Sequence, residues 1–67
     1  MKARVELWDT SESCVEAVRQ TLGQLPGGNS LLIEEGGNWY VVGSEFSVWA
    51  AEHQGYVKRV LSREDGR

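Results

Sequence analysis

Apolar and polar residues alternate along the first eight positions of the chain. Three apolar side chains share one side of an extended segment: Ala3, Val5 and Leu7. The other side carries Lys2, Arg4, Glu6 and Trp8. A period of two residues is typical of a strand with one buried face. The pattern therefore predicts a half-buried strand from Lys2 to Trp8.

The next segment has the three- and four-residue spacing of an amphipathic helix. Its apolar stripe consists of Val15, Val18, Leu22 and Leu25, and Cys14 lies beside it. Oxygen atoms that could cap the first turn are supplied by Asp9, Thr10, Ser11 and Ser13. We expect the helix to stop at Pro26-Gly27-Gly28, because proline cannot continue it and glycine tolerates a left-handed turn.

Two short apolar runs, Leu31 to Ile33 and Trp39 to Val42, flank the sequence Glu35-Gly36-Gly37-Asn38. A glycine pair between runs of branched and aromatic residues is typical of a β-hairpin. Both predicted strands are apolar on both faces. Helices can cover one face, so the other face meets a partner, a second chain, loops or water.

A second helix is predicted after Ser44, which can cap it. We expect its apolar face to include Phe46, Trp49, Ala50 and His53. Gly55 leaves two alternatives, of which we prefer that it ends the helix and that Tyr56 to Leu61 returns as a strand. In the other alternative the helix continues through Gly55, at a cost of about 1 kcal/mol relative to alanine. The charged segment from Ser62 to Arg67 is expected to fray.

These elements predict an α+β fold in two layers, with helices on one face of a small, mostly antiparallel sheet. The order is βαββαβ, or βαββα if the C-terminal segment is helical. A chain of 67 residues buries only about 60% of its unfolded surface. We therefore expect one domain over residues 1–67 with a thin stability margin, which self-association or partner binding would increase.

Composition and charge exclude several classes of function. The net charge of −3 argues against nucleic-acid binding, which needs clustered cations. No apolar run approaches the roughly 20 residues of a membrane span, and the N-terminus lacks the apolar core of a signal peptide. We therefore expect a cytoplasmic protein that binds neither nucleic acid nor a membrane.

The candidate chemistry of the chain is sparse. One cysteine and one histidine provide neither an internal disulfide nor a four-ligand zinc site, so no metal or cofactor is predicted. Cys14, near a helix start, is either a thiol activated by the helix N-terminus or a small core residue. His53 could be a general base, although a histidine near a helix end more commonly caps carbonyl groups or packs.

The chain resembles the TusA/SirA-like family of small sulfur-carrier proteins. The resemblance rests on Val15, Leu22, Leu25, Pro26 and Gly28, followed by Phe46, Trp49-Ala50, Gly55 and Glu64-Asp65-Gly66. It implies a two-layer α+β fold and a cysteine that carries persulfide sulfur. The family has a Cys-Pro pair at the start of its first helix, where this chain has Ser11-Glu12. Sulfur transfer would therefore depend on Cys14, three positions later.

The aromatic residues are the more informative candidates for function. The residues predicted to bind a partner are Trp8, Leu32, Trp39 and Tyr40. Aromatic anchors supply much of the binding energy at protein interfaces. We therefore predict a non-enzymatic protein–protein interaction module, of the accessory or inhibitor type, that docks an aromatic sheet face onto a protein or onto its own copy. The alternative is a TusA-like sulfur carrier that uses Cys14.

Overall fold

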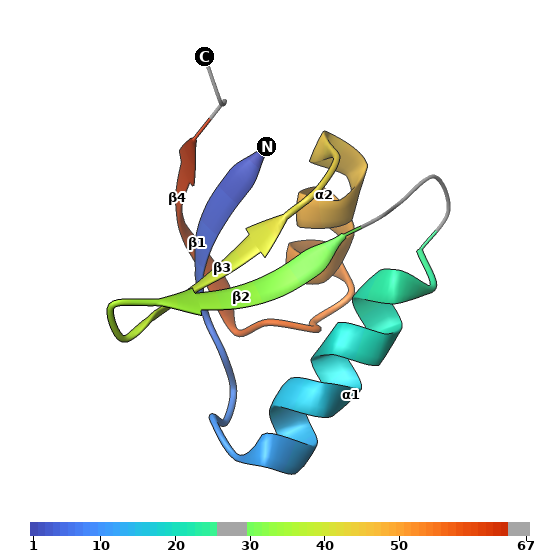
Figure 1. Ribbon diagram of the computed structural model, residues 1–67. Coiled ribbons are helices and arrows are strands. Elements are labelled where there is room, and N and C mark those ends of the chain that lie inside the picture. Colours follow the sequence, from blue (N-terminus) through green and yellow to red (C-terminus); the bar gives the residue numbers. More distant parts are fainter. Residues whose placement is uncertain (26–29, 65–67) are drawn as a thin grey trace.

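Six elements follow one another in the order β-α-β-β-α-β (Figure 1). The computed structural model describes residues 1–25 and 30–64. The strands are β1 (Lys2–Glu6), β2 (Leu31–Glu35), β3 (Asn38–Val42) and β4 (Arg59–Glu64), and the helices are α1 (Glu12–Gly23) and α2 (Glu45–His53). Of the two alternatives at Gly55, the strand is confirmed. It begins at Arg59, three residues later than predicted, and includes part of the segment that we expected to fray.

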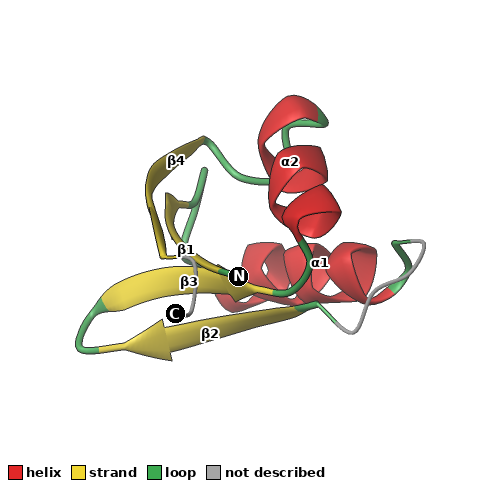
Figure 2. Ribbon diagram, turned by 90° about the horizontal axis from the view of Figure 1, so that it is seen from above, coloured by secondary structure: helices red, strands yellow, loops and turns green. Residues whose placement is uncertain are grey.

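The four strands form one antiparallel sheet in the order β2-β3-β1-β4. Helix α1 connects β1 to β2, which have β3 between them, and α2 connects β3 to β4, which have β1 between them. This arrangement is the ferredoxin-like, or split βαβ, topology. Both helices lie on the same side of the sheet, α1 against β2 and α2 against β3 (Figure 2). The predicted two-layer α+β fold is therefore confirmed.

The turn between β2 and β3 contains only Gly36 and Gly37. Their φ angles are 58° and 82°, as a two-residue hairpin turn of type I′ requires at both central positions. The turn pairs Glu35 with Asn38 and fixes the register of the remaining residues of the hairpin. The hairpin predicted from the glycine pair is confirmed.

The core lies between the sheet and the two helices. Its buried apolar side chains are Ala3, Val5, Leu7, Val15, Val18, Leu22, Leu32, Val41, Val48, Ala51 and Val57. The alternation of β1 and the stripe of α1 are therefore confirmed, although β1 ends at Glu6 and not at Trp8. Leu25 also packs against this core, although α1 ends at Gly23. The predicted stop at residues 26–28 lies outside the described residues.

The buried face of α2 is not the one that the sequence predicts. Ser47, Val48, Ala50 and Ala51 are buried, whereas Phe46, Trp49 and His53 are exposed. Both sets follow helical spacing, and hydrophobicity favours the aromatic set. The helix nevertheless places its small side chains toward the sheet, where Ser47 meets the buried Ser30. Of the four residues predicted to form the apolar face, only Ala50 is buried.

A hydroxyl cluster joins α2 to the segments that flank the hairpin. The hydroxyl of buried Ser30 donates a hydrogen bond to the hydroxyl of buried Ser47. The Oγ atoms of Ser47 and Ser44 are 3.0 Å apart, and Ser44 also accepts a bond from the Ser47 backbone N–H as the helix cap. Gly43 lies directly against this cluster, because a Cβ atom there would lie 2.7 Å from Oγ of Ser30.

Replacing Gly43 with alanine should destabilise the fold by about 1–3 kcal/mol, the usual cost of overpacking a core. The added methyl group would press on Ser30 and displace a hydroxyl that is already bonded to Ser47. Urea unfolding followed by tryptophan fluorescence measures the change. The matched control is Gly23→Ala, because a Cβ atom there meets open space and alanine is the better helix former. Equal stability of Gly43→Ala and the native chain would contradict this account of the cluster.

Candidate interaction surface: the open face of the sheet

The sheet face opposite the helices carries a row of apolar side chains. Leu32 and Val41 are buried beneath the helices, so their neighbours along the strands point to the other face. Leu31 pairs with Val42, and Ile33 pairs with Tyr40. We call these four residues the apolar row: Leu31, Ile33, Tyr40 and Val42. Leu31 is 59% exposed, so the row offers apolar surface to a partner.

The other half of the open face is charged. Its side chains come from β1 and β4, whose pairing aligns Lys2 with Glu64, Arg4 with Ser62 and Glu6 with Arg59. The Arg59 guanidinium lies 2.9 Å from a carboxylate oxygen of Glu6. A break in register between Arg4 and Val5 leaves an additional residue on β4. The face therefore combines an apolar half over β2 and β3 with a charged half over β1 and β4.

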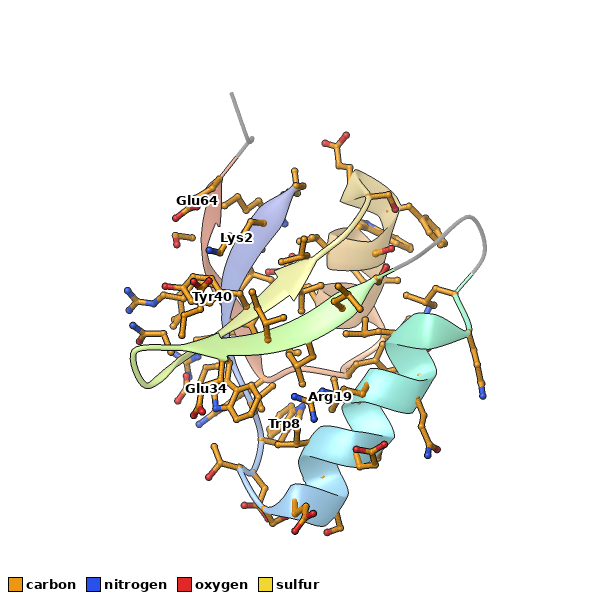
Figure 3. All side chains as sticks on the ribbon, in the orientation of Figure 1. Lys2, Trp8, Arg19, Glu34, Tyr40 and Glu64 are labelled. Atoms are coloured by element: carbon orange, nitrogen blue, oxygen red, sulfur yellow. The ribbon has the colours of Figure 1, made fainter. Side chains whose placement is uncertain are left out.

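Lys2 connects the two halves across Tyr40 (Figure 3). Its ammonium nitrogen is 2.6 Å from Oε1 of Glu35 and 4.5 Å from the centre of the Tyr40 ring. The first contact is a charge-assisted hydrogen bond and the second a cation–π contact. The hydrogen bond to Glu35 is the main reason that the pKa of Lys2 rises above its ordinary value of 10.5. The Lys2 ammonium group thereby restricts the Tyr40 ring from one side.

The four residues predicted to bind a partner do not form one surface. Tyr40 lies on the open face. Trp39 points to the opposite face and packs against the core, because neighbouring residues of a strand alternate. Leu32 is only 3% exposed, so its predicted contact role is corrected to a core role. Trp8 is 63% exposed, and its indole N–H donates a 3.0 Å hydrogen bond to the carbonyl of Gly55.

The prediction missed the remaining members of the apolar row, Leu31, Ile33 and Val42. The signal was present, because they alternate with Leu32 and Val41 along the two strands. The sequence pattern did not show which of the two sets the helices would cover.

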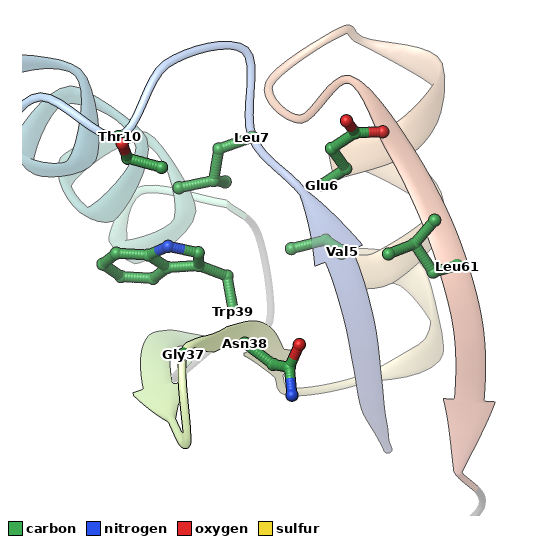
Figure 4. Close-up of a pocket in the computed structure, with 8 residues that line it drawn as sticks. All are labelled: Val5, Glu6, Leu7, Thr10, Gly37, Asn38, Trp39 and Leu61. Atoms are coloured by element: carbon green, nitrogen blue, oxygen red, sulfur yellow. The ribbon is translucent and has the colours of Figure 1, made fainter.

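The partly buried Trp39 ring borders an open hollow of about 440 Å³ (Figure 4). It lies where β1 and β3 separate beyond the pairing of Val5 with Trp39. Its lining residues are Val5, Glu6, Leu7, Thr10, Gly37, Asn38, Trp39 and Leu61. The only ionisable group among them, Glu6, already pairs with Arg59. The hollow could hold an apolar side chain, but its lining provides no pair of acid and base groups.

The other two candidates, Cys14 and His53, lie on the helices. Cys14 is half-buried in the first turn of α1, and its backbone N–H donates to the hydroxyl of Ser11. The His53 ring is exposed, and its Nδ1–H donates a 3.0 Å hydrogen bond to the carbonyl of Trp49, one turn earlier. Within residues 1–25 and 30–64, no group of three or more His, Cys, Asp or Glu side chains could hold a metal ion. In the same residues, neither helix has the length and apolar character needed to cross a membrane.

Glu35→Gln should lower the pKa of Lys2 toward 10.5, because it removes the carboxylate that stabilises the ammonium. Because the pKa of Lys2 is higher in the folded state than in the unfolded chain, the pair with Glu35 stabilises the fold at pH values below the ordinary pKa. This contribution is lost as the pH rises through the higher, folded-state value. An NMR titration of the Lys2 side chain measures the change. Glu34→Gln is the matched control, because Glu34 points to the other face. Identical Lys2 titrations in both variants would contradict the assigned cause.

Comparisons with known proteins found no relative of this chain. No protein-family model matches the chain, and no curated protein or solved structure matches it significantly. The resemblance to the TusA/SirA-like family therefore stays a prediction. The ferredoxin-like topology hosts many unrelated functions, so the function has to be argued from the surfaces of this chain.

Proposed function

We propose that the protein is a non-enzymatic interaction module that binds another protein, or a second copy of itself, through the open face of its sheet. One observation carries the proposal: a row of four apolar side chains lies on a face that neither helix covers. Apolar area removed from water contributes about 25 cal/mol per Å², so covering this row favours association. In this role the protein would act as an accessory or inhibitor subunit.

Tyr40 is the best anchor in the row. Tyrosine is enriched among the residues that dominate binding energy, because a rigid ring buries a large area at a low entropic cost. Lys2 already restricts this ring on one side. The charges beside it are partly paired within the chain, Lys2 with Glu35 and Glu6 with Arg59. The charged half therefore suits a polar rim that sets the orientation of the partner.

The two edges of the sheet are less suitable for binding than its face. On edge strand β2, the Arg19 side chain of α1 donates a 3.3 Å hydrogen bond to the carbonyl of Leu32. Edge strand β4 is irregular in register and carries Arg59, Arg63 and Glu64. Charged side chains and bulges are common devices against edge-to-edge pairing. A partner is therefore expected to cover the apolar row rather than to extend the sheet.

Leu31→Lys should weaken association through the open face about tenfold or more, because it places a charge in the apolar row. Leu31 is 59% exposed, so the fold should tolerate the change. The matched control is Ala17→Lys, which adds the same charge on the exposed side of α1. Sedimentation equilibrium over a range of concentrations measures self-association of the three proteins.

A protein partner is tested with the same three chains as immobilised baits in lysate of the source cell. The expected partner is retained by the native chain and by Ala17→Lys and is lost with Leu31→Lys. The proposal is wrong if the native chain stays monomeric and no captured protein depends on Leu31.

A sulfur carrier that uses Cys14 is the second candidate function. It is supported by the position of this thiol in the first turn of α1, where it stays partly accessible. Helix N-termini stabilise negative charge. Against it, the first turn also contains Glu12, and a carboxylate opposes a thiolate.

We expect iodoacetamide to alkylate Cys14 more slowly in the folded protein than in the denatured chain, because the side chain is half-buried. Alkylation rates followed by mass spectrometry across a pH series measure this difference, and Cys14→Ser supplies the blank. Faster reaction in the folded protein, together with a persulfide on Cys14 after incubation with a cysteine desulfurase, would establish the second candidate instead.

A further inference from the structure

Three aromatic rings stack along the solvent-exposed side of α2. The ring centres of Phe46 and Trp49 are 5.9 Å apart with an interplanar angle of 25°, and those of Trp49 and His53 are 4.7 Å apart at 19°. The three residues are spaced three and four positions apart, so they lie one above another on the helix. We call them the aromatic column. Phe46 and Trp49 are 46% and 45% exposed.

The aromatic column contributes little to the core. The opposite side of α2 packs against the sheet through Ser47, Val48, Ala50 and Ala51. The rings stack on one another instead, and about half of Phe46 and of Trp49 stays in water. The hydrogen bond from the His53 ring to the Trp49 carbonyl fixes the end of the stack nearest the C-terminus of α2. An exposed, ordered group of rings of this kind is typical of a binding surface.

Two carboxylates border the aromatic column on one side. Glu45 and Glu52 are seven residues apart, nearly two helical turns, so they lie along the same line of α2 next to Trp49. Glu52 accepts a 3.2 Å hydrogen bond from the guanidinium of Arg63 on β4. Glu45 makes no ion pair with the described residues. This border therefore already holds one guanidinium group and has a second carboxylate available.

We propose that this outer face of α2 binds a basic segment of a partner protein. An arginine guanidinium would stack on the outer face of the Phe46 ring and pair with Glu45, and its methylene groups would lie against the exposed edge of Trp49. A guanidinium stacks on aromatic rings and forms paired hydrogen bonds with carboxylates, so this combination of groups suits arginine better than lysine. The net charge of −3 attracts a cationic partner at longer range.

Charge complementarity favours such a partner over a second copy of this chain. A second copy of the same face would bring two further carboxylates, and its Arg63 is already paired with Glu52. The surface also differs from the open face of the sheet, because α2 lies on the opposite side of the molecule (Figure 2). The inference is therefore independent of the function proposed for the apolar row.

The test uses a short capped peptide of repeated Arg-Ala-Ala units, with Lys-Ala-Ala and Glu-Ala-Ala peptides of equal length for comparison. Titrations into the 15N-labelled full chain are followed by backbone and indole NMR signals. We expect saturable shifts at α2 and at the Trp49 indole, strongest for the arginine peptide. Trp49→Leu and Glu45→Gln should each weaken binding about fivefold. Circular dichroism verifies that both variants are folded.

Two controls keep this test separate from the sheet face. Glu16→Gln, on the exposed side of α1, removes the same charge away from the aromatic column and should bind the arginine peptide like the native chain. Leu31→Lys should also bind the arginine peptide, with at most a small loss of affinity from its added positive charge. Three outcomes would overturn the inference. The native chain could bind the arginine and glutamate peptides equally well, Trp49→Leu could bind the arginine peptide as tightly as the native chain, or Glu16→Gln could weaken binding as much as Glu45→Gln. None of these outcomes bears on the apolar row.

Discussion

The two-residue turn at Gly36 and Gly37 decides which side chains of β2 and β3 share a face of the sheet. Positive φ angles at both glycines pair Glu35 with Asn38, and every later pair follows from that one. A shift of one residue would exchange the two faces of a strand. Leu31 and Ile33 would then share a face with Val41 instead of with Tyr40 and Val42. The turn chemistry therefore explains why the four residues of the apolar row share one face.

The local patterns predicted most of the fold but could not choose the open face. The turn, the stripe of α1 and the alternation of β1 are short-range signals, and the structure confirms them. The choice between Trp39 and Tyr40 is different, because both strands are apolar on both faces. It depends on where α1 and α2 cross the sheet, between strands that are distant in the sequence. The sequence named both Trp39 and Tyr40 as contact residues, but it could not tell that only Tyr40 lies on the open face.

Helix α2 shows a second reason why the sequence was misleading. Hydrophobicity favours burial of Phe46 and Trp49, but the buried side of α2 meets Ser30 through Ser47, and Ser30 is itself packed closely against Gly43. Close packing then outweighs the gain from burying larger rings. A sequence signal did exist, because Ser47, Val48, Ala50 and Ala51 together form a continuous small-residue side of the helix. The aromatic column lies on the opposite side of α2 from these buried residues.

The distribution of ring side chains connects the stability of the fold to the proposed function. The chain has three tryptophans, two tyrosines and one phenylalanine, and all six are exposed or only partly buried. The core consists of aliphatic residues no larger than leucine. A small domain gains stability by burying large side chains, so leaving these outside forgoes stabilisation that the fold could use. A partner that covers the apolar row or the aromatic column would restore part of it, because a ligand that binds only the native state stabilises that state. With the proposed partners, binding would therefore stabilise the folded state through Tyr40, Phe46 and Trp49.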